Sequence, residues 1–282
     1  MPSDAPRAAG RAPLRLTATY LVLIVLAALV LFPVYMTLVR ALSTPVAHID
    51  AGSPPYPVRP QWDVFSRALR DGDLLGAAGR SLVMTSIITA VQVATSCLAA
   101  YAFVFLRFPL KRVVFAVYMA TLMIPIEVTI IANVQFIRQI GWNDSMQGLV
   151  APFLATALGT FLIRQGFLGV PDEIRDATRL DGYGHLRFLW RIAIPLTRPV
   201  IASFTVISFL GAWNQYLWPR AIIDTERQQT LQIALQRLAT TNVESSNVIV
   251  AGALLAGLPI LVLLIFFQRH IVRGLTAGAV KG

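Results

Sequence analysis

The chain has 282 residues, of which 56% are hydrophobic and only 13% are charged. A water-soluble domain normally carries about 25% charged residues, so this composition excludes an ordinary soluble domain and indicates a membrane protein. The formal net charge of +10 does not indicate nucleic-acid binding, because the basic residues fall in short loops and form no patch interleaved with aromatic side chains. The single cysteine, Cys97, excludes a disulfide framework and a cysteine-ligated metal site, and we expect it to be a small buried residue.

Six windows of the sequence are long and apolar enough to cross a hydrocarbon core of about 30 Å, which takes about 20 helical residues. Only the third window contains a charged residue, Glu127. Because lipid-exposed backbone must satisfy its own hydrogen bonds, we expect all six windows to be helices. They are residues 17–39, 81–106, 113–137, 145–163, 199–219 and 248–267.

The first window follows Arg7, Arg11 and Arg15, as the apolar core of a signal peptide would. Its 23 uncharged residues exceed a typical signal-peptide core, and no A-x-A-like cleavage site follows, so we predict a retained span. The predicted organisation is therefore an amino-terminal tail at 1–16, a six-span domain at 17–267 and a carboxy-terminal tail at 268–282.

The basic residues predict the orientation of the spans. The two tails and the loops after the second and fourth windows hold 15 of the 24 Lys and Arg residues, so we place them, with both termini, in the cytoplasm. Arg59, Arg67, Arg70 and Arg80 in the Pro-rich first external loop weaken this asymmetry without reversing it. The prediction is a multi-pass membrane protein with both termini in the cytoplasm.

A polar block at residues 171–198 interrupts the apolar chain in the second cytoplasmic loop. Its first part is predicted to be a short helix, because proline suits a first turn and acidic residues suit a helix N-terminus. The residues concerned are Pro171, Asp172 and Glu173, with Ile174, Ala177 and Leu180 (or Asp181) on one face.

The glycines of "DGYG" are expected to turn the chain after this helix. A second, amphipathic helix is predicted to follow and to end at Pro195 and Pro199, with Tyr183, Leu186, Leu189, Trp190 and Ala193 on one side. Such a helix pair either lies on the membrane surface or docks into a soluble partner.

The polar block resembles the EAA loop of ABC-importer permeases, whose pattern is E-A-A, three residues, Gly, nine residues and I-x-L-P. Asp176-Ala177-Thr178 stands for E-A-A, Gly182 for the glycine, and Ile192-Ala193-Ile194-Pro195 for I-x-L-P. Both spacings match, and the substitutions are Asp for Glu, Thr for Ala and Ile for Leu. "WNQYLWP", "TLQIAL" and the ending "RGLTAGAVKG" resemble the carbohydrate-uptake branch, of the maltose importer's smaller-permease type, and "TLMIPIEVTII" resembles the second permease of sn-glycerol-3-phosphate importers.

This resemblance implies an all-α polytopic protein of the bacterial inner membrane with six transmembrane helices and a cytoplasmic helix-turn-helix coupling loop, the type I ABC importer permease fold. It implies import of a sugar or polyol, in particular sn-glycerol-3-phosphate or a related glycerophosphodiester, with another sugar or oligosaccharide as the alternative. The implied partners are a second, homologous permease, a cytoplasmic ATPase dimer, an extracytoplasmic binding protein and membrane lipid, without nucleic acid.

No G-x-x-x-x-G-K-[ST] phosphate loop occurs in the sequence, so we expect no enzyme activity and no cofactor in this chain, with ATP and Mg bound by the partner ATPase. The polar block would then be a coupling helix pair that receives force from the ATPase. The implied coupling residues are Glu173, Asp176, Ala177, Thr178, Asp181, Gly182, Tyr183 and Gly184.

Several polar residues within or beside the apolar windows are candidates for a substrate pathway. An intramembrane carboxylate such as Glu127 marks either a pathway or a bond to a neighbouring span that fixes packing. The other candidates are Asn133, Trp213, Asn214, Gln215 and Tyr216, whereas we assign Trp218 to an aromatic belt at the membrane interface.

Two further segments take roles from the resemblance. The last external loop, with Thr241, Asn242, Val243, Glu244 and Ser245, is expected to reach the cleft of the binding protein, and its alternative is a solvated linker. The tail residues Gly278, Ala279, Val280, Lys281 and Gly282 are expected to lie along the ATPase dimer.

Two other classes remain as alternatives. A secondary transporter often shows paired repeats with broken helices, and no such pairing is visible in the sequence. A membrane enzyme would need a catalytic constellation, but His48, His185 and His270 fall in or beside loops without metal-ligand spacing, so we predict no metal site.

Overall fold

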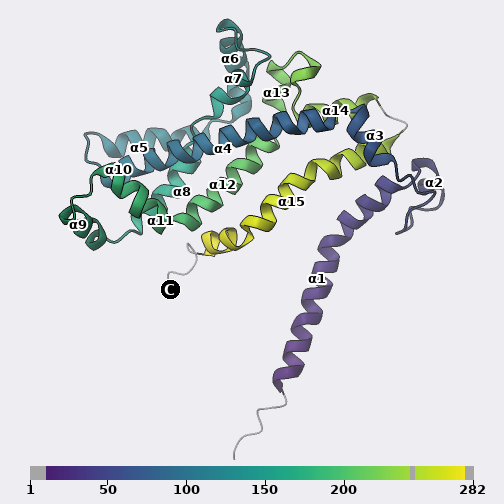
Figure 1. Ribbon diagram of the computed structural model, residues 1–282, viewed down its shortest axis with the longest axis horizontal. Helices are drawn as coiled ribbons and strands as arrows, with labels where there is room; N and C mark the ends of the chain where they lie inside the picture. The colour runs from purple at the N-terminus through teal and green to yellow at the C-terminus, as the bar shows by residue number, and fades with distance from the viewer. Residues whose placement is uncertain (1–10, 242–244, 277–282) are drawn as a thin grey trace, which may run out of the picture. The chain divides into compact units, whose positions relative to one another are not determined.

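The computed structural model describes residues 11–241 and 245–276, and every regular element within these ranges is helical. The chain divides into two compact units, one formed by residues up to 69 with 238–255, the other by residues 70–237 with those from 256 onward. Figure 1 labels the helices of both units. The all-α prediction is confirmed for the described residues.

The first unit contains a long apolar helix and a compact cap of short segments. Its elements are α1 (Arg11–Leu42), α2 (Pro45–Asp50), most of α3 (Val64–Asp71), the end of α14 (Leu231–Thr241) and the start of α15 (Ser246–Thr276). The side chain of Gln61 joins two parts of the unit, since its Oε1 accepts from Asn247 Nδ2 at 2.8 Å and from Arg67 Nη2 at 2.6 Å. The predicted Pro-rich loop is therefore partly helical and folded.

Three helices form the centre of the second unit. They are α4 (Leu74–Phe105), α8 (Ala157–Leu168) and α12 (Arg198–Trp213), which pack against one another, and Figure 1 shows α4 running alongside the other two. The shorter elements of this unit are α5 (Lys111–Ala120), η1 (Thr121–Met123), α6 (Ile126–Gln139), α7 (Met146–Val150), η2 (Ala151–Phe153), α9 (Asp172–Leu180), α10 (His185–Phe188), η3 (Leu189–Ala193), α11 (Ile194–Leu196), α13 (Leu217–Ile222) and η4 (Glu226–Gln228).

Helix α4 contributes to two hydrophobic clusters, one toward each of its ends. Met84 and Ile88 pack with residues of α6, α7 and α13, while Cys97 and Tyr101 pack with residues of α8, α12 and the polar block. The expected burial of Cys97 is confirmed. These two clusters hold the two candidate functional regions at separate positions along α4.

Three single helices are long and apolar enough to cross a membrane, namely Leu16–Leu42, Leu74–Phe105 and Ser246–Gln268. They correspond to the first, second and sixth predicted windows, although α4 begins seven residues before the predicted residue 81. If each of three bent helix pairs also crosses once, the described chain has six spans by length and composition.

The third and fourth predicted windows are each broken into two helices, and a third bend lies just before the fifth window. Lys111–Met123 and Glu127–Gln139 meet at 99°, Met146–Phe153 and Ala157–Leu168 at 47°, and His185–Leu196 and Arg198–Trp213 at 83°. In the first pair Ile124 is extended, as expected for a residue before proline, and Pro125 caps α6. The fifth window also ends early, because α12 stops at Trp213 and residues 214–216 separate it from α13.

Candidate functional site

The polar block begins with the predicted helix, here α9. A glycine in the left-handed conformation follows this helix and terminates it. Gly182 has φ +74°, its N–H donates to Arg179 O at 3.0 Å, and the N–H of Tyr183 donates to Thr178 O at 2.9 Å. These two bonds form a Schellman motif, in which glycine avoids the steric cost of a Cβ. The predicted turn is confirmed. Pro171, however, is extended and caps the helix from outside, so its predicted place in the first turn is wrong.

The buried face of α9 is rotated from the predicted one. Thr178 is buried and Ile174 is half-buried, whereas Ala177 is exposed and Leu180 is 90% exposed. The hydroxyl of Thr178 donates to Arg175 O at 2.9 Å, which allows this polar residue to occupy the inner face. The outer face therefore presents Ala177 and Leu180 to the surroundings.

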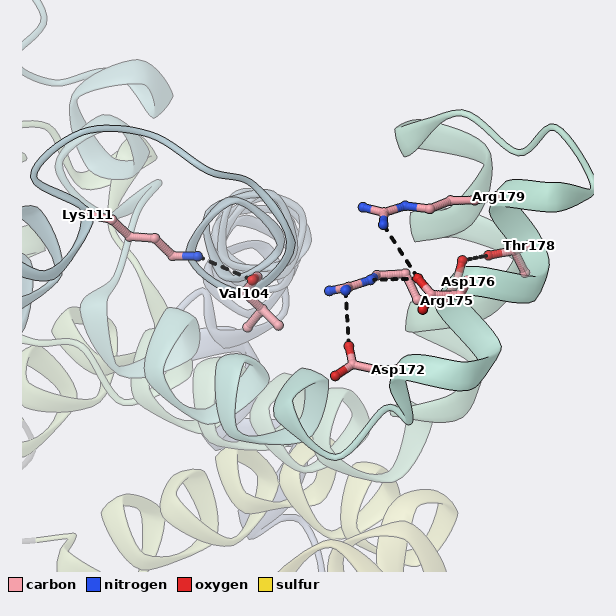
Figure 2. A network of polar contacts seen from close by, with 7 residues as sticks. All are labelled: Val104, Lys111, Asp172, Arg175, Asp176, Thr178 and Arg179. Atoms are coloured by element: carbon pink, nitrogen blue, oxygen red, sulfur yellow. Dashed lines mark hydrogen bonds and ion pairs between the residues drawn. The ribbon is translucent and has the colours of Figure 1, made fainter.

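An ion-pair network covers one side of α9. Arg175 Nη2 lies 3.2 Å from Asp172 Oδ1 and its Nε lies 3.9 Å from Asp176 Oδ1, while Arg179 Nη1 lies 3.5 Å from the same Asp176 oxygen. Figure 2 shows Asp176 between the two arginines. Exposed pairs of this kind contribute little to stability, so their main effect is to orient the side chains.

The second helix of the polar block is interrupted by a π-helical turn, η3, between α10 and α11. Phe188, Leu189 and Ala193 are buried, whereas Leu186 is 67% and Trp190 is 61% exposed, so the residues predicted to share one side differ in burial. The reason is that Phe188 packs against α4, with its ring centroid 5.2 Å from that of Phe105. This contact turns Leu186 and Trp190 outward.

A side-chain hydrogen bond joins the polar block to α4. Tyr101 Oη lies 2.8 Å from His185 Nδ1, beside a pocket of about 190 Å³ that Arg175, Arg179 and Tyr183 also line. Sequence reasoning missed Tyr101, because this contact joins residues 84 positions apart. The signal it offered was a polar aromatic residue at the end of an apolar window.

The connection after α4 is fixed by a lysine at the start of α5. Lys111 Nζ donates to Val104 O at 3.2 Å and to Leu106 O at 2.9 Å, and the first of these bonds is drawn in Figure 2. Both acceptors are carbonyls at the end of α4, which a cation stabilises. This end of α4, close in sequence to Tyr101, is therefore held in a defined conformation.

A second region, formed by α6, α13 and the segment 211–216, encloses a pocket of about 460 Å³. Figure 1 shows α6, α7 and α13 gathered on one side of α4. The structure brings together five of the predicted pathway residues, together with aromatic and aliphatic neighbours. The lining residues are Glu127, Thr129, Asn133, Asn214, Gln215 and Tyr216, with Ile130, Pro152, Phe153, Gly211, Leu217 and Trp218.

The two tryptophans of "WNQYLWP" are placed differently from their predictions. Trp213 is 1% exposed, donates from Nε1 to Ala256 O at 3.3 Å and is not among the lining residues of this pocket, so it is a core residue here. Trp218 is only 4% exposed and donates from Nε1 to Gly148 O at 3.2 Å. It is a core residue that lines the pocket, and its assignment to an interfacial belt is wrong.

The last external loop and the tail lie largely outside the described residues. Thr241 ends α14 and Ser245 accepts from the N–H of Val248 at 2.9 Å, while Asn242, Val243, Glu244 and the tail from Gly278 to Gly282 are not described. Over the described ranges, no group of three or more His, Cys, Asp or Glu side chains is placed to hold a metal ion.

Residues 92–277 match the family described as "binding-protein-dependent transport system inner membrane component". The chain is 34% identical over 264 residues to the sn-glycerol-3-phosphate transport system permease protein UgpE of Yersinia pestis bv. Antiqua, covering 91% of this chain and 94% of the relative. The UgpE protein of Rhizobium meliloti is 34% identical over 268 residues, with the same shares covered.

Among solved structures, the chain is similar to one described as a bacterial ABC transporter involved in the import of the acidic polysaccharide alginate. The TM-score is 0.76 at 21% identity, covering 94% of this chain and 99% of that one. A second structure, of a bacterial alginate ABC transporter in complex with a pentasaccharide-bound periplasmic protein, gives a TM-score of 0.62 at 12% identity, covering 93% and 98%. These similarities show the permease fold.

Proposed function

Because this chain belongs to the family of inner membrane components of binding-protein-dependent transport systems, we propose that it is the permease subunit through which an ATP-driven importer takes up sn-glycerol-3-phosphate or a related glycerophosphodiester. The names of relatives 34% identical over 91% of the chain support this substrate class. A different sugar or oligosaccharide is the alternative, which the similarity to alginate transporters favours.

The proposal that this chain is coupled to an ATPase rests on the polar block. Its helix, Schellman turn and second helix expose the apolar side chains of Ala177, Leu180, Leu186 and Trp190, which a soluble partner would cover. We propose that this surface docks on an ATPase subunit, with Glu173, Asp176 and Asp181 as its charged rim. Nucleotide-driven movement of the ATPase would then move the block and, through Tyr101 and Phe105, helix α4.

The remaining roles complete the proposed importer. A second permease pairs with this chain, ATP and Mg bind to the ATPase dimer, and both termini lie in the cytoplasm. The loop containing residues 241–245 contacts the extracytoplasmic binding protein, and the tail at 278–282 lies along the ATPase dimer. The order of polar loops and the family membership support these roles.

The test is uptake by the complete importer in proteoliposomes, made from this chain, its second permease, the ATPase and the binding protein. We expect uptake of labelled sn-glycerol-3-phosphate only with ATP and loaded binding protein both present, and none with a catalytically inactive ATPase. ATP-independent uptake by this chain alone, driven by an ion gradient, would instead establish a secondary transporter.

Removal of the Tyr101 hydroxyl tests whether the contact with His185 transmits movement from the polar block to α4. Tyr101→Phe keeps the ring contacts with Phe105 and Phe188 but removes the bond to His185, and a hydrogen bond of this kind contributes about 0.5–1.5 kcal/mol. We expect substrate imported per ATP hydrolysed to fall roughly threefold to tenfold, with unchanged membrane insertion.

The control for Tyr101 is Tyr118→Phe. This variant removes a phenolic hydroxyl that accepts a 3.4 Å bond from Thr160 and does not contact the polar block. It should leave the ratio of import to hydrolysis at the wild-type value. Equal ratios for both variants would show that the Tyr101–His185 bond plays no part in coupling.

A further inference from the structure

The pocket between α6 and α13 offers a ligand several hydrogen-bond acceptors. Asn133 Nδ2 donates to Thr129 Oγ1 at 3.4 Å, and Asn214 Nδ2 donates to Leu210 O at 2.9 Å, so both amides direct nitrogen toward their own helices. Their amide oxygens are available to accept from a ligand. The carboxylate of Glu127, an acceptor when ionised, lines the same pocket.

Gln215 provides an independent observation. Its Oε1 is buried, and among the described residues no donor reaches it. A buried acceptor without a donor is costly, so such atoms in native proteins are normally satisfied by something. Because Gln215 lines the pocket, a ligand that donates a hydrogen bond would satisfy it.

The charge of the pocket excludes the phosphate group of the proposed substrate. No lysine or arginine is among the lining residues that the structure describes, and the one charged lining residue, Glu127, is acidic. A phosphate group beside this carboxylate would be repelled, with no cation in the lining to offset the repulsion. A hydroxyl group carries no such penalty.

The aromatic side chains of the lining favour contact with the C–H groups of the same kind of ligand. The rings of Phe153 and Trp218 meet edge to face, with centroids 5.9 Å apart. The indole N–H of Trp218 is already bonded to Gly148 O, so Trp218 offers a ligand only its ring surface. Such surfaces suit the C–H groups of a polyol, while the neighbouring oxygens accept from its hydroxyls.

We infer that this pocket is a subsite for the uncharged, polyhydroxylated part of the cargo and that it excludes the phosphate. The inference rests on the proposed function and names which end of the substrate this chain recognises. Hydroxyls of the glycerol or sugar moiety donate to Glu127 and to Gln215 Oε1. The anionic end of a phosphorylated cargo is held outside this pocket.

Two substitutions at Glu127 test whether a hydroxyl group or the phosphate group of the cargo lies beside this residue. The complete importer is assayed in proteoliposomes with saturating binding protein and sn-glycerol-3-phosphate as the probe. Glu127→Gln retains an acceptor of the same size, so we expect uptake within twofold of wild type. Glu127→Leu removes the acceptor, and loss of one hydrogen bond to a charged group reduces uptake roughly tenfold or more.

Gln215→Leu is the corresponding change at the buried acceptor, and we expect a roughly tenfold loss of uptake. The matched control is Gln135→Leu, the same substitution at an exposed position of α6 that does not line the pocket, with uptake unchanged. Size-exclusion chromatography of each complex verifies assembly. If Gln215→Leu fails to assemble, the two variants at the exposed Glu127 decide the question.

Two outcomes overturn the subsite. Wild-type uptake in both Glu127→Leu and Gln215→Leu would show that the cargo does not use the pocket, and a severalfold increase in Glu127→Gln would show that the phosphate lies there. Either result leaves the proposed function intact, because the wild-type importer is active in the same assay. Absence of ATP-dependent uptake by the wild-type importer would instead remove the proposed function itself.

Discussion

Gly182→Val is expected to uncouple the importer, so that ATP is hydrolysed while uptake falls at least tenfold. At φ +74° a β-branched side chain is strained, although no atom lies within 4 Å of the added Cβ. The cost therefore comes from the backbone, of the order of 1–3 kcal/mol, and it is relieved by opening the Schellman turn. Opening the turn changes the angle between α9 and α10, and hence the surface proposed to face the ATPase.

Two companion variants isolate this effect. Gly182→Asn keeps most of the uptake, because asparagine tolerates the left-handed region better than valine does. Gly141→Val places the same residue at φ +73°, also with no atom within 4 Å, between α6 and α7. It should lower stability by a similar amount without changing the ratio of import to hydrolysis.

The measurement for both glycines is substrate imported per ATP hydrolysed in proteoliposomes, with thermal stability of the complex recorded in detergent. A normal ratio for Gly182→Val would remove the coupling role of this turn. A reduced ratio for Gly141→Val as well would mean that general destabilisation, and not the conformation of the polar block, accounts for the loss.

Gly159→Ala is expected to destabilise the folded chain strongly. Gly159 lies where α8 meets α4 and α12, and an added Cβ would overlap Phe204 Cζ and Ser96 Oγ and lie 2.6 Å from Phe204 Cε1. Phe204 is buried, so its ring has little room to move. Small residues allow close approach of membrane helices, and overpacking here should destabilise the protein by about 1–3 kcal/mol or more.

Fluorescence-detected size-exclusion chromatography after heating measures this loss. Gly79→Ala on α4 is the control, because no atom lies within 4 Å of its added Cβ, and it should be neutral or slightly stabilising. Phe204→Leu in the Gly159→Ala background removes the overlapping ring atoms and should recover part of the stability, giving a non-additive cycle. Full thermal stability of Gly159→Ala alone would contradict the close packing of these helices.

The polar block was predictable from the sequence because its signals are local. An acidic first turn and a glycine two residues past the end of the helix each act within a few residues, and α9 with its Schellman turn confirms both signals. Burial inside the block was less predictable. The helix faces depend on Phe188, which packs against residues far away in the sequence.

The candidate pocket was predictable as a set of residues but not as a site. Asn133 and Gln215 were recognisable as amides in or beside apolar windows, yet only the packing of α6 against α13 places them in one pocket with Glu127. The same packing buries Trp218 as a lining residue, and the contact with Ala256 removes Trp213 from the pocket.

The sequence by itself determined that this protein is helical, that its apolar segments suit a membrane, and that one polar block forms a helix, a turn and a second helix. Tertiary structure alone decided where the apolar segments bend, which of their faces are buried and which polar residues meet. The physical reason is that a helix in lipid is apolar on every side, so its sequence carries little periodic contrast between a lipid-facing and a buried face. Contacts such as Tyr101 with His185, or Gly159 with Phe204, arise only when distant helices pack.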